Sequence, residues 1–258
     1  MIKAVFFDVD GTLMSHKLND VPESTRKSLA ELRKRGIKTV IATGRHMIEL
    51  SKLPVMQGLE FDGYLTLNGQ LCLDKTMHVV AGNPIDAGEM EILISIFHAK
   101  RIPFMLIGQD DRYINMINPT VIKTQAATKG TVPNIGAYKG EKIYQAIAFV
   151  PDNQRQLLDS ILDECAITSW NTTGIDIISR GGGKSQGIQK FLDEEGISRS
   201  EIMAFGDGEN DMDMLKFAGI GVAMGNASDT VKAAADYVTD SVDDNGIEKA
   251  LRHFGLIE

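Results

Sequence analysis

The stretch Ala4-Val5-Phe6-Phe7-Asp8-Val9-Asp10-Gly11-Thr12 decides how the rest of the chain is interpreted. Its first four residues are all apolar, which is typical of a strand covered on both faces within a parallel sheet. Side chains alternate along a strand, so Asp8 and Asp10 share one side while Val9 points to the other. Gly11 lets the backbone turn back directly after them. Because open α/β sheets bind ligands at the carboxyl ends of their strands, these two carboxylates are candidates for a site.

Two aspartates in this arrangement can also simply mark the end of a strand. Three later segments favour a site, because each follows a predicted strand or opens a predicted helix: Thr43-Gly44, Lys184 and Gly206-Asp207-Gly208-Glu209-Asn210-Asp211. In a doubly wound sheet such places share one edge, so all four segments could line one crevice. That crevice would hold four aspartates, a lysine, a hydroxyl and an amide, beside several glycine-rich turns.

The composition is that of an ordinary globular enzyme. The chain has 258 residues, enough for one large domain or two ordinary ones, with 43% hydrophobic and 24% charged residues. A net charge of −8 and the lack of a basic tract argue against a nucleic-acid partner. No apolar run approaches the roughly 18 residues that a membrane helix needs, so we expect no membrane partner either.

The two cysteines and the N-terminus bear on the cellular compartment. Cys72 and Cys165 lie far apart in apolar surroundings, which predicts buried free thiols in a reducing compartment. The N-terminus runs straight into the first predicted strand and leaves no room for a signal peptide. We therefore expect a cytoplasmic protein.

Strands and helices alternate at both ends of the chain. The first part predicts a helix from Pro22 to a stop at Gly36, a strand over 37–42, a helix over 46–53, and two strands split by the hairpin signal Asn68-Gly69. After Gly181-Gly182-Gly183 the alternation resumes. There we expect helices starting near 184 and over 210–217, 228–235 and from 246, with strands over 202–205, 221–223 and 237–238.

The middle of the chain follows another pattern. We expect helices over 86–100, 120–128 and 152–164, and strands over 104–107, 112–117, 143–150, 167–170 and 175–178. Runs of paired strands with separate helices are typical of an α+β unit. The predicted fold is thus α/β, with a doubly wound, mostly parallel, Rossmann-like core over 1–82 plus 180–258. An α+β cap domain is inserted over 83–179.

Electrostatics predicts a cation in the crevice. Two like charges 4 Å apart repel by about 4 kcal/mol at an effective dielectric constant near 20, and Lys184 can neutralise only one carboxylate. Carboxylate oxygens suit Mg²⁺, which commonly bridges carboxylates to phosphate. Glycine-rich turns and helix N-termini suit the phosphate itself. Asp8 could then act as a nucleophile toward phosphorus, while Asp10 passes a proton to a leaving oxygen.

The same residues resemble a known family. Asp8-Val9-Asp10-Gly11-Thr12 resembles the first motif of the haloacid dehalogenase-like superfamily of phosphohydrolases, and Thr43, Lys184 and Gly206-Asp207-Gly208-Glu209-Asn210-Asp211 match its second, third and fourth motifs in order. Ser185 stands where a glycine often follows the family lysine. The long insert resembles, by its placement, the C2B cap of the Cof-like sugar-phosphate phosphatases. The tail after Val231 is also similar to that group, so the resemblance covers the whole chain.

The resemblance implies roles for the acidic residues. Asp8 would be the nucleophile that forms an aspartyl-phosphate, and it would also bind Mg²⁺. Asp10 would be the general acid and base and would offer its backbone carbonyl to the metal. Asp207 would be a metal ligand. Asp211 would orient Lys184 or a metal-bound water.

It also implies roles for the phosphate-binding groups. The backbone of Val9, the Thr43 hydroxyl and the Gly44 N–H would hold phosphate oxygens. Asn210 would contact phosphate as well, and Lys184 would neutralise both the phosphoryl group and Asp8. Arg45 follows the second motif directly, and a contact with substrate and a surface ion pair are about equally expected for it.

The implied activity is Mg²⁺-dependent hydrolysis of small phosphomonoesters. Hexose and pentose phosphates come first as substrates, with nucleotides, flavin mononucleotide and pyridoxal phosphate behind. The cap would exclude water and choose the leaving group. Asp10 distinguishes the chain from a dehalogenase. Two alternatives stay open: a phosphomutase, and a non-enzymatic phosphate-binding module on the same fold. The physiological ester, its cap contacts and the oligomeric state are not encoded in these motifs.

Overall fold

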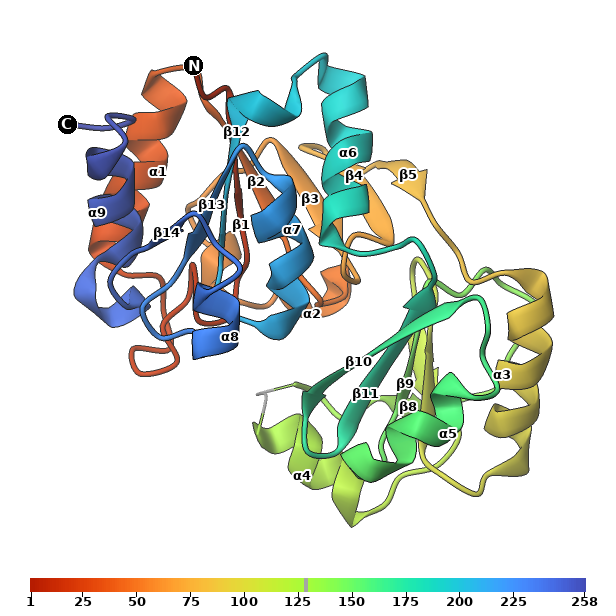
Figure 1. Ribbon diagram of the computed structural model, residues 1–258. Coiled ribbons are helices and arrows are strands. Elements are labelled where there is room, and N and C mark those ends of the chain that lie inside the picture. The colour runs from red at the N-terminus through yellow and green to blue at the C-terminus, as the bar shows by residue number, and fades with distance from the viewer. Residues whose placement is uncertain (128–129) are drawn as a thin grey trace. The chain divides into compact units, whose positions relative to one another are not determined.

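The computed structural model describes residues 1–127 and 130–258 and divides the chain into two compact units. Unit 1 comprises Met1–Ala81 and Gly183–Glu258, and unit 2 comprises Gly82–Gly182 (Figure 1). The insert expected over 83–179 lies within unit 2. Among the described residues, no helix is both long enough and apolar enough to cross a membrane.

Unit 1 is built on an eight-stranded sheet in the order β14-β13-β12-β1-β2-β3-β4-β5. Its strands are β1 (Ala4–Phe7), β2 (Lys38–Ala42), β3 (Gly63–Thr66), β4 (Leu71–Asp74), β5 (Val79–Gly82), β12 (Ile202–Gly206), β13 (Ile220–Ala223) and β14 (Tyr237–Val238). From β14 to β3 every neighbouring pair is parallel, and β4 returns antiparallel to β3. This order confirms the predicted doubly wound, mostly parallel α/β core.

Helices cover both faces of this sheet. They are α1 (Glu23–Lys34), α2 (Met47–Leu50), α6 (Lys184–Glu195), α7 (Met212–Phe217), α8 (Asp229–Lys232) and α9 (Gly246–His253), with short 3₁₀ turns at Pro54–Met56, Arg199–Glu201, Glu209–Asp211 and Val242–Asp244. Figure 1 shows α1 and α9 side by side on one face, while α6 and α7 lie on the other. The unbroken apolar run of β1 follows from this double cover.

Alternate residues of β1 serve the two faces. Phe7 packs in the core cluster that α1 and α9 complete, where it stacks on Phe205 with ring centroids 5.2 Å apart. Phe6 packs on the other face, where it meets Phe191 of α6 edge-on at 5.5 Å. Both β1 aromatics are fully buried. Buried apolar packing therefore holds the end of β1, and the aspartates that follow it, in place.

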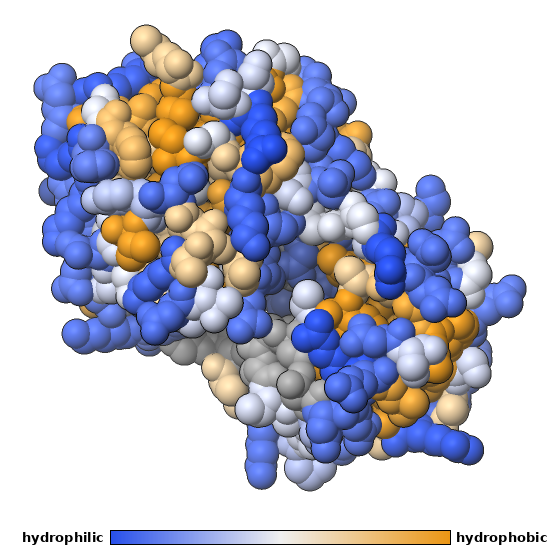
Figure 2. Space-filling model, in the orientation of Figure 1, coloured by the Kyte–Doolittle hydropathy of each residue, from blue (hydrophilic) through white to orange (hydrophobic). Residues whose placement is uncertain are grey.

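Unit 2 has a six-stranded sheet in the order β10-β11-β9-β6-β7-β8. Its strands are β6 (Phe104–Ile107), β7 (Arg112–Ile114), β8 (Asn134–Ile135), β9 (Gln145–Ala148), β10 (Cys165–Asn171) and β11 (Gly174–Ser179), and its helices are α3 (Ala87–Ala99), α4 (Pro119–Ala127) and α5 (Arg155–Asp159), with a 3₁₀ turn at Asp152–Gln154. Neighbouring strands among the described residues of this sheet pair antiparallel except β7 with β8, which confirms an α+β insert. Figure 2 shows apolar side chains gathered over α3 and α5, where Leu157 is 64% exposed.

Several predicted elements are shorter in the structure. The helix expected over 152–164 ends at Asp159. A turn follows, in which the Leu162 N–H donates to the Leu158 carbonyl oxygen, and this turn buries both leucines without a further helical segment. The strand expected over 112–117 ends at Ile114. Directly after it, the Asn115 side chain accepts from the Phe104 N–H and donates to the Phe97 and Ile102 carbonyl oxygens. The helix over 46–53 is only α2, and that over 228–235 only α8. The end of the predicted helix at Thr128 lies outside the described residues.

The packing of β1 gives a first prediction. Phe6→Ala is expected to lower the free energy of unfolding of unit 1 by about 3–5 kcal/mol, because it leaves a cavity against Phe191. Denaturant unfolding measures the change. Leu18→Ala is the control, since Leu18 is 57% exposed and its truncation should change stability by less than about 0.5 kcal/mol. A loss below about 1 kcal/mol for Phe6→Ala would contradict this account of the core.

Candidate active site

The loops that follow β1 and β12 bring three aspartates together. These strands pair in parallel with Phe7 opposite Phe205, and the Asp8 N–H donates to the Phe205 carbonyl oxygen at 3.0 Å. One carboxylate oxygen each from Asp8, Asp207 and Asp211 lies within 4.8 Å of the others. Residues about 200 positions apart in the chain thus share one site, because parallel strands place their carboxyl ends at one edge of the sheet.

Lys184, the first residue of α6, lies inside this cluster. Its side chain is fully buried, and its Nζ donates to Asp8 Oδ1 at 2.6 Å and to Asp211 Oδ1 at 2.5 Å. The lysine is placed by the start of its helix. Gly183, with φ +125°, turns the chain into α6, and the Asp213 carboxylate accepts from the Ser185 N–H at 2.9 Å. The ammonium group therefore bridges the carboxylates that follow β1 and β12.

The cluster holds more negative than positive charge. Burial, reinforced by Asp211, raises the pKa of Asp8 well above its ordinary value, although Lys184 opposes the shift. Burial and then Asp211 raise the pKa of Asp207 to about 7. For Lys184, burial alone would lower the pKa, but Asp211 and Asp8 together outweigh it and raise the pKa. The cluster thus has three carboxylates and one ammonium, which leaves an excess of negative charge. Hard oxygen donors with such an excess fit a divalent cation.

Asp211 also organises the loop that carries Asp207. Its Oδ2 accepts from the Asp207 N–H at 2.9 Å and from the Gly208 N–H at 2.8 Å, and the side chain is almost fully buried. With Oδ1 on Lys184, both oxygens of Asp211 have partners. Asp211 therefore orients the lysine and the loop at the same time.

Asp10 lies apart from the carboxylate cluster and pairs with Arg45. The Arg45 Nε donates to Asp10 Oδ2 at 2.6 Å, and its NH2 group donates to Oδ1 at 2.8 Å. The Arg45 side chain is 15% exposed, so the ion pair is mostly shielded from water. Burial would lower the Arg45 pKa, but the hydrogen bond and charge of Asp10 outweigh it and raise the pKa. Of the two expectations for Arg45, an ion pair is present, and it is made with a candidate catalytic residue.

The candidate phosphate-binding residues lie on neighbouring loops. Thr43 is buried, and its Oγ1 accepts from the Arg45 N–H at 3.2 Å. A Cβ on Gly44 would lie 3.1 Å from Asn68 Oδ1, the atom to which Asn210 Nδ2 donates at 3.0 Å. The loops after β2, β3 and β12 therefore meet around Asn68.

The backbone of Val9 is engaged locally. Its side chain is fully buried in the core, and its carbonyl oxygen accepts from the Met14 N–H at 2.8 Å. The roles expected for Val9, Gly44 and Asn210 toward phosphate, and for the Asp10 carbonyl toward a metal, stay predictions.

The sequence motifs do not predict three residues of the site. Asn68 is predicted only as a turn residue, and its φ of +55° shows the left-handed conformation that asparagine tolerates. Thr12 Oγ1 donates to Asp207 Oδ1 at 3.1 Å, and Asn226 Nδ2 donates to Asp207 Oδ2 at 3.0 Å. A signal for Asn226 existed, since it is a polar residue just after a predicted strand of the parallel sheet.

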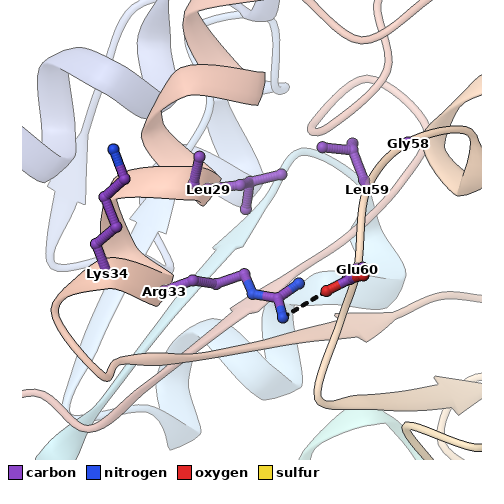
Figure 3. Close-up of a pocket in the computed structure, with 7 residues that line it drawn as sticks. Leu29, Arg33, Lys34, Gly58, Leu59 and Glu60 are labelled. Atoms are coloured by element: carbon purple, nitrogen blue, oxygen red, sulfur yellow. Dashed lines mark ion pairs between the residues drawn. The ribbon is translucent and has the colours of Figure 1, made fainter.

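A separate hollow lies elsewhere on unit 1. It has a volume of about 700 Å³ and lies between α1 and residues 58–60, where Figure 3 shows Arg33 reaching toward Glu60. Arg33 NH2 lies 2.6 Å from Glu60 Oε2 in an exposed ion pair. The residues that line this hollow include none of the candidate site residues, so it does not belong to the aspartate cluster.

Comparison with known proteins identifies the family. The model of the haloacid dehalogenase-like hydrolases matches residues 5–251. The chain belongs to this family. The 5-amino-6-(5-phospho-D-ribitylamino)uracil phosphatase YcsE of Bacillus subtilis is 32% identical over 262 residues, with 99% of this chain and 96% of that protein covered.

Solved structures resemble both units. BT1666 from Bacteroides thetaiotaomicron, a phosphatase of this superfamily, matches with a TM-score of 0.91 and 35% identity over 100% of this chain and 96% of that one. The subclass IIB sugar phosphatase BT4131 matches with a TM-score of 0.90 and 34% identity over 99% and 100% of the two chains. Within its family this haloacid dehalogenase-like hydrolase is a Cof-like phosphatase with a C2B cap, and it is a phosphoric monoester hydrolase.

The close packing of Gly11 against Asp207 gives a second prediction. Gly11 has φ +79°, and a Cβ there would lie 2.2 Å from Asp207 Oδ2. Gly11→Ala must therefore displace this carboxylate, and we expect the rise in melting temperature on adding Mg²⁺ to be largely lost.

Gly36→Ala is the matched control for that variant. Gly36 has φ +73° and nothing within 4 Å of the added Cβ, so it carries the left-handed backbone penalty of about 1–2 kcal/mol without the crowding. It should lower the melting temperature but keep the full response to the cation. Equal responses in the two variants would show that the carboxylate does not depend on Gly11.

Proposed function

We propose that this phosphatase hydrolyses small phosphomonoesters, with sugar phosphates first, through an aspartyl-phosphate on Asp8 and with Mg²⁺ as cofactor. The observation that carries the proposal is the cluster in which carboxylate oxygens of Asp8, Asp207 and Asp211 lie within 4.8 Å of one another, with the buried Lys184 ammonium between Asp8 and Asp211. Carboxylate oxygens with an excess of negative charge suit Mg²⁺. The positive charge of the metal would in turn suit an anionic phosphoryl group.

In the first step, a carboxylate oxygen of Asp8 forms a bond to phosphorus while the bond from phosphorus to the ester oxygen breaks. Asp10 gives a proton to the departing oxygen, which leaves as an alcohol. In the second step, water attacks the phosphorus, Asp10 takes the proton from that water, and Asp8 departs as a carboxylate. The products are the alcohol and inorganic phosphate, and both aspartates return to their starting states.

Arg45 stays beside Asp10 during this cycle. Each oxygen of Asp10 accepts one hydrogen bond from Arg45 and keeps a second lone-pair site that can take a proton. The five N–H donors of a guanidinium suit phosphate oxygens as well as carboxylates. We therefore propose that Arg45 orients Asp10 before the reaction and can share its donors with the substrate.

The metal would be held by Asp8, by Asp207 and by the backbone carbonyl of Asp10, and it would supply positive charge to the carboxylates and to the phosphate. The lysine adds to that charge from its fixed place between Asp8 and Asp211. Thr43, Gly44 and Asn210 would hold phosphate oxygens through a hydroxyl, a backbone N–H and a side-chain amide, and the backbone of Val9 would do the same.

The substrate class is inferred from the relatives and from the insert. BT4131 is described as a sugar phosphatase, and YcsE acts on a phosphoribityl compound, so both names concern a phosphate on a small polyhydroxylated carbon chain. We propose that unit 2 selects the leaving group. A cytoplasmic location belongs to the same proposal, because Cys72 and Cys165 are both free thiols that suit a reducing compartment.

The nucleophile is tested by Asp8→Asn. The amide cannot form the aspartyl-phosphate, so Mg²⁺-dependent hydrolysis of p-nitrophenyl phosphate should fall by several orders of magnitude. Asp193→Asn is the control, because Asp193 is exposed on α6 and accepts a hydrogen bond from Gln189 on the same helix. Unchanged turnover in Asp8→Asn would discard the covalent mechanism.

The metal is tested by thermal unfolding. Mg²⁺ at 100 times its dissociation constant should stabilise the folded chain by about 2.7 kcal/mol if the unfolded chain does not bind it. A chelator should reverse the effect, and Asp207→Asn should abolish most of it because a ligand is lost. A wild-type melting curve that is the same with Mg²⁺ and with chelator would count against the metal site.

A further inference from the structure

We infer that Asn226 is a positioning residue of the active site: its side-chain amide fixes the carboxylate of Asp207 in the orientation that receives the cation. Asn226 lies in the loop after β13, outside the four segments from which the site was predicted. The inference rests on the proposed function, since it concerns the metal ligand Asp207, but it adds a residue and a loop to the machinery.

The amide of Asn226 has a partner for each of its polar groups. Its Nδ2 donates to Asp207 Oδ2 at 3.0 Å and to the Gly11 carbonyl oxygen at 2.9 Å, and its Oδ1 accepts from the Val242 N–H at 3.0 Å. A flipped amide would set an oxygen against two acceptors and an NH₂ group against an N–H donor. The hydrogen bonds therefore define which way the amide points, and the NH₂ group must face the carboxylate.

The loop that carries Asn226 is itself held firmly. The Gly225 N–H donates to the Asp240 carbonyl oxygen at 3.0 Å, and a Cβ on Gly225 would lie 2.6 Å from the Ser241 nitrogen. The backbone directly before the asparagine is thus packed against residues 239–241. Asn226 itself is exposed, so its orientation depends on this anchored backbone and on the three hydrogen bonds of its amide.

Asp207 is held from two sides by neutral donors. Thr12, from the loop after β1, donates to Oδ1 at 3.1 Å, while Asn226 donates to Oδ2. Each carboxylate oxygen has two lone-pair sites, so one hydrogen bond on each oxygen leaves further sites for a cation. Because both donors are uncharged, they orient the carboxylate without neutralising it. Asn226 also ties this carboxylate to the Gly11 backbone and so sets its position relative to Asp8 and Asp10.

Groups that hold a metal ligand commonly change metal affinity or activity about 10–100-fold when they are removed. We therefore expect Asn226→Ala to weaken cation binding by about 10–100-fold. The probes are Mg²⁺, through the rise of melting temperature with its concentration, and Mn²⁺, through the paramagnetic resonance signal of the free ion. Both are measured on the full chain without substrate.

If Asn226 only anchored its loop, Asn226→Ala would lower the melting temperature in chelator but leave the cation affinity unchanged. Asn226→Ala also removes the acceptor of the Val242 N–H, so its melting temperature in chelator reports that structural loss separately. Ser241→Ala is the matched control from the neighbouring segment, since it removes one exposed hydrogen bond to Asp244 and should keep wild-type cation affinity. Saturating Mg²⁺ should also restore turnover of Asn226→Ala to within several-fold of wild type, because the reacting groups remain.

The outcomes separate the inference from the proposed function. If wild-type protein shows no response to either cation, the metal site and the inference both fail. If wild-type protein binds the cations and Asn226→Ala binds them within about twofold as well, the inference alone is overturned. A 10–100-fold weaker affinity in Asn226→Ala, with wild-type affinity in Ser241→Ala, supports the positioning role.

Discussion

The buried contact of the Lys184 ammonium with Asp8 and Asp211 is the interaction on which the rest of the site depends. Charges taken out of water are unfavourable unless they are paired and hydrogen-bonded, and removing one partner of a buried pair commonly costs 3–5 kcal/mol. Here one ammonium contacts two carboxylates. An oxygen of a third carboxylate, Asp207, lies within 4.8 Å of an oxygen of each of them. The two contacts with the ammonium offset the cost of burying Asp8 and Asp211. The cluster still keeps an excess of negative charge, which favours a bound cation.

The fold supplies this group by bringing strand ends together rather than by local sequence. Parallel pairing of β1 with β12 sets Asp8 beside Asp207, and α6 on one face of the sheet delivers its first residue into the same space. Glycines permit the close approaches: Gly69 lies against Gly183, and Gly11 lies against Asp207. Aromatic packing of β1 on both faces keeps these contacts from loosening.

The aspartates of one site are held by different means, which suits them to different work. Asp8 contacts a buried ammonium, Asp10 contacts a guanidinium nearer the surface, and Asp207 is held by the neutral donors of Thr12 and Asn226. The roles proposed for them, as nucleophile, proton carrier and metal ligand, need these distinct surroundings. The role inferred for Asn226 adds the loop after β13 to the site. Its side-chain amide is oriented by three hydrogen bonds, one of which goes to Asp207.

The amino-acid sequence by itself determined the class of fold and the segments that carry the chemistry. Apolar runs that end in Asp8 or Gly206-Asp207 are local patterns, and so are glycine turns and helix starts such as Lys184. Only the tertiary structure decided the partner of Arg45, the meeting of Asn68 with Asn210, and the hold of Asn226 on Asp207. The physical reason is that periodicity and turn preference report on a few neighbouring residues, whereas hydrogen-bond partners are chosen by the register and packing of strands and loops far apart in the chain.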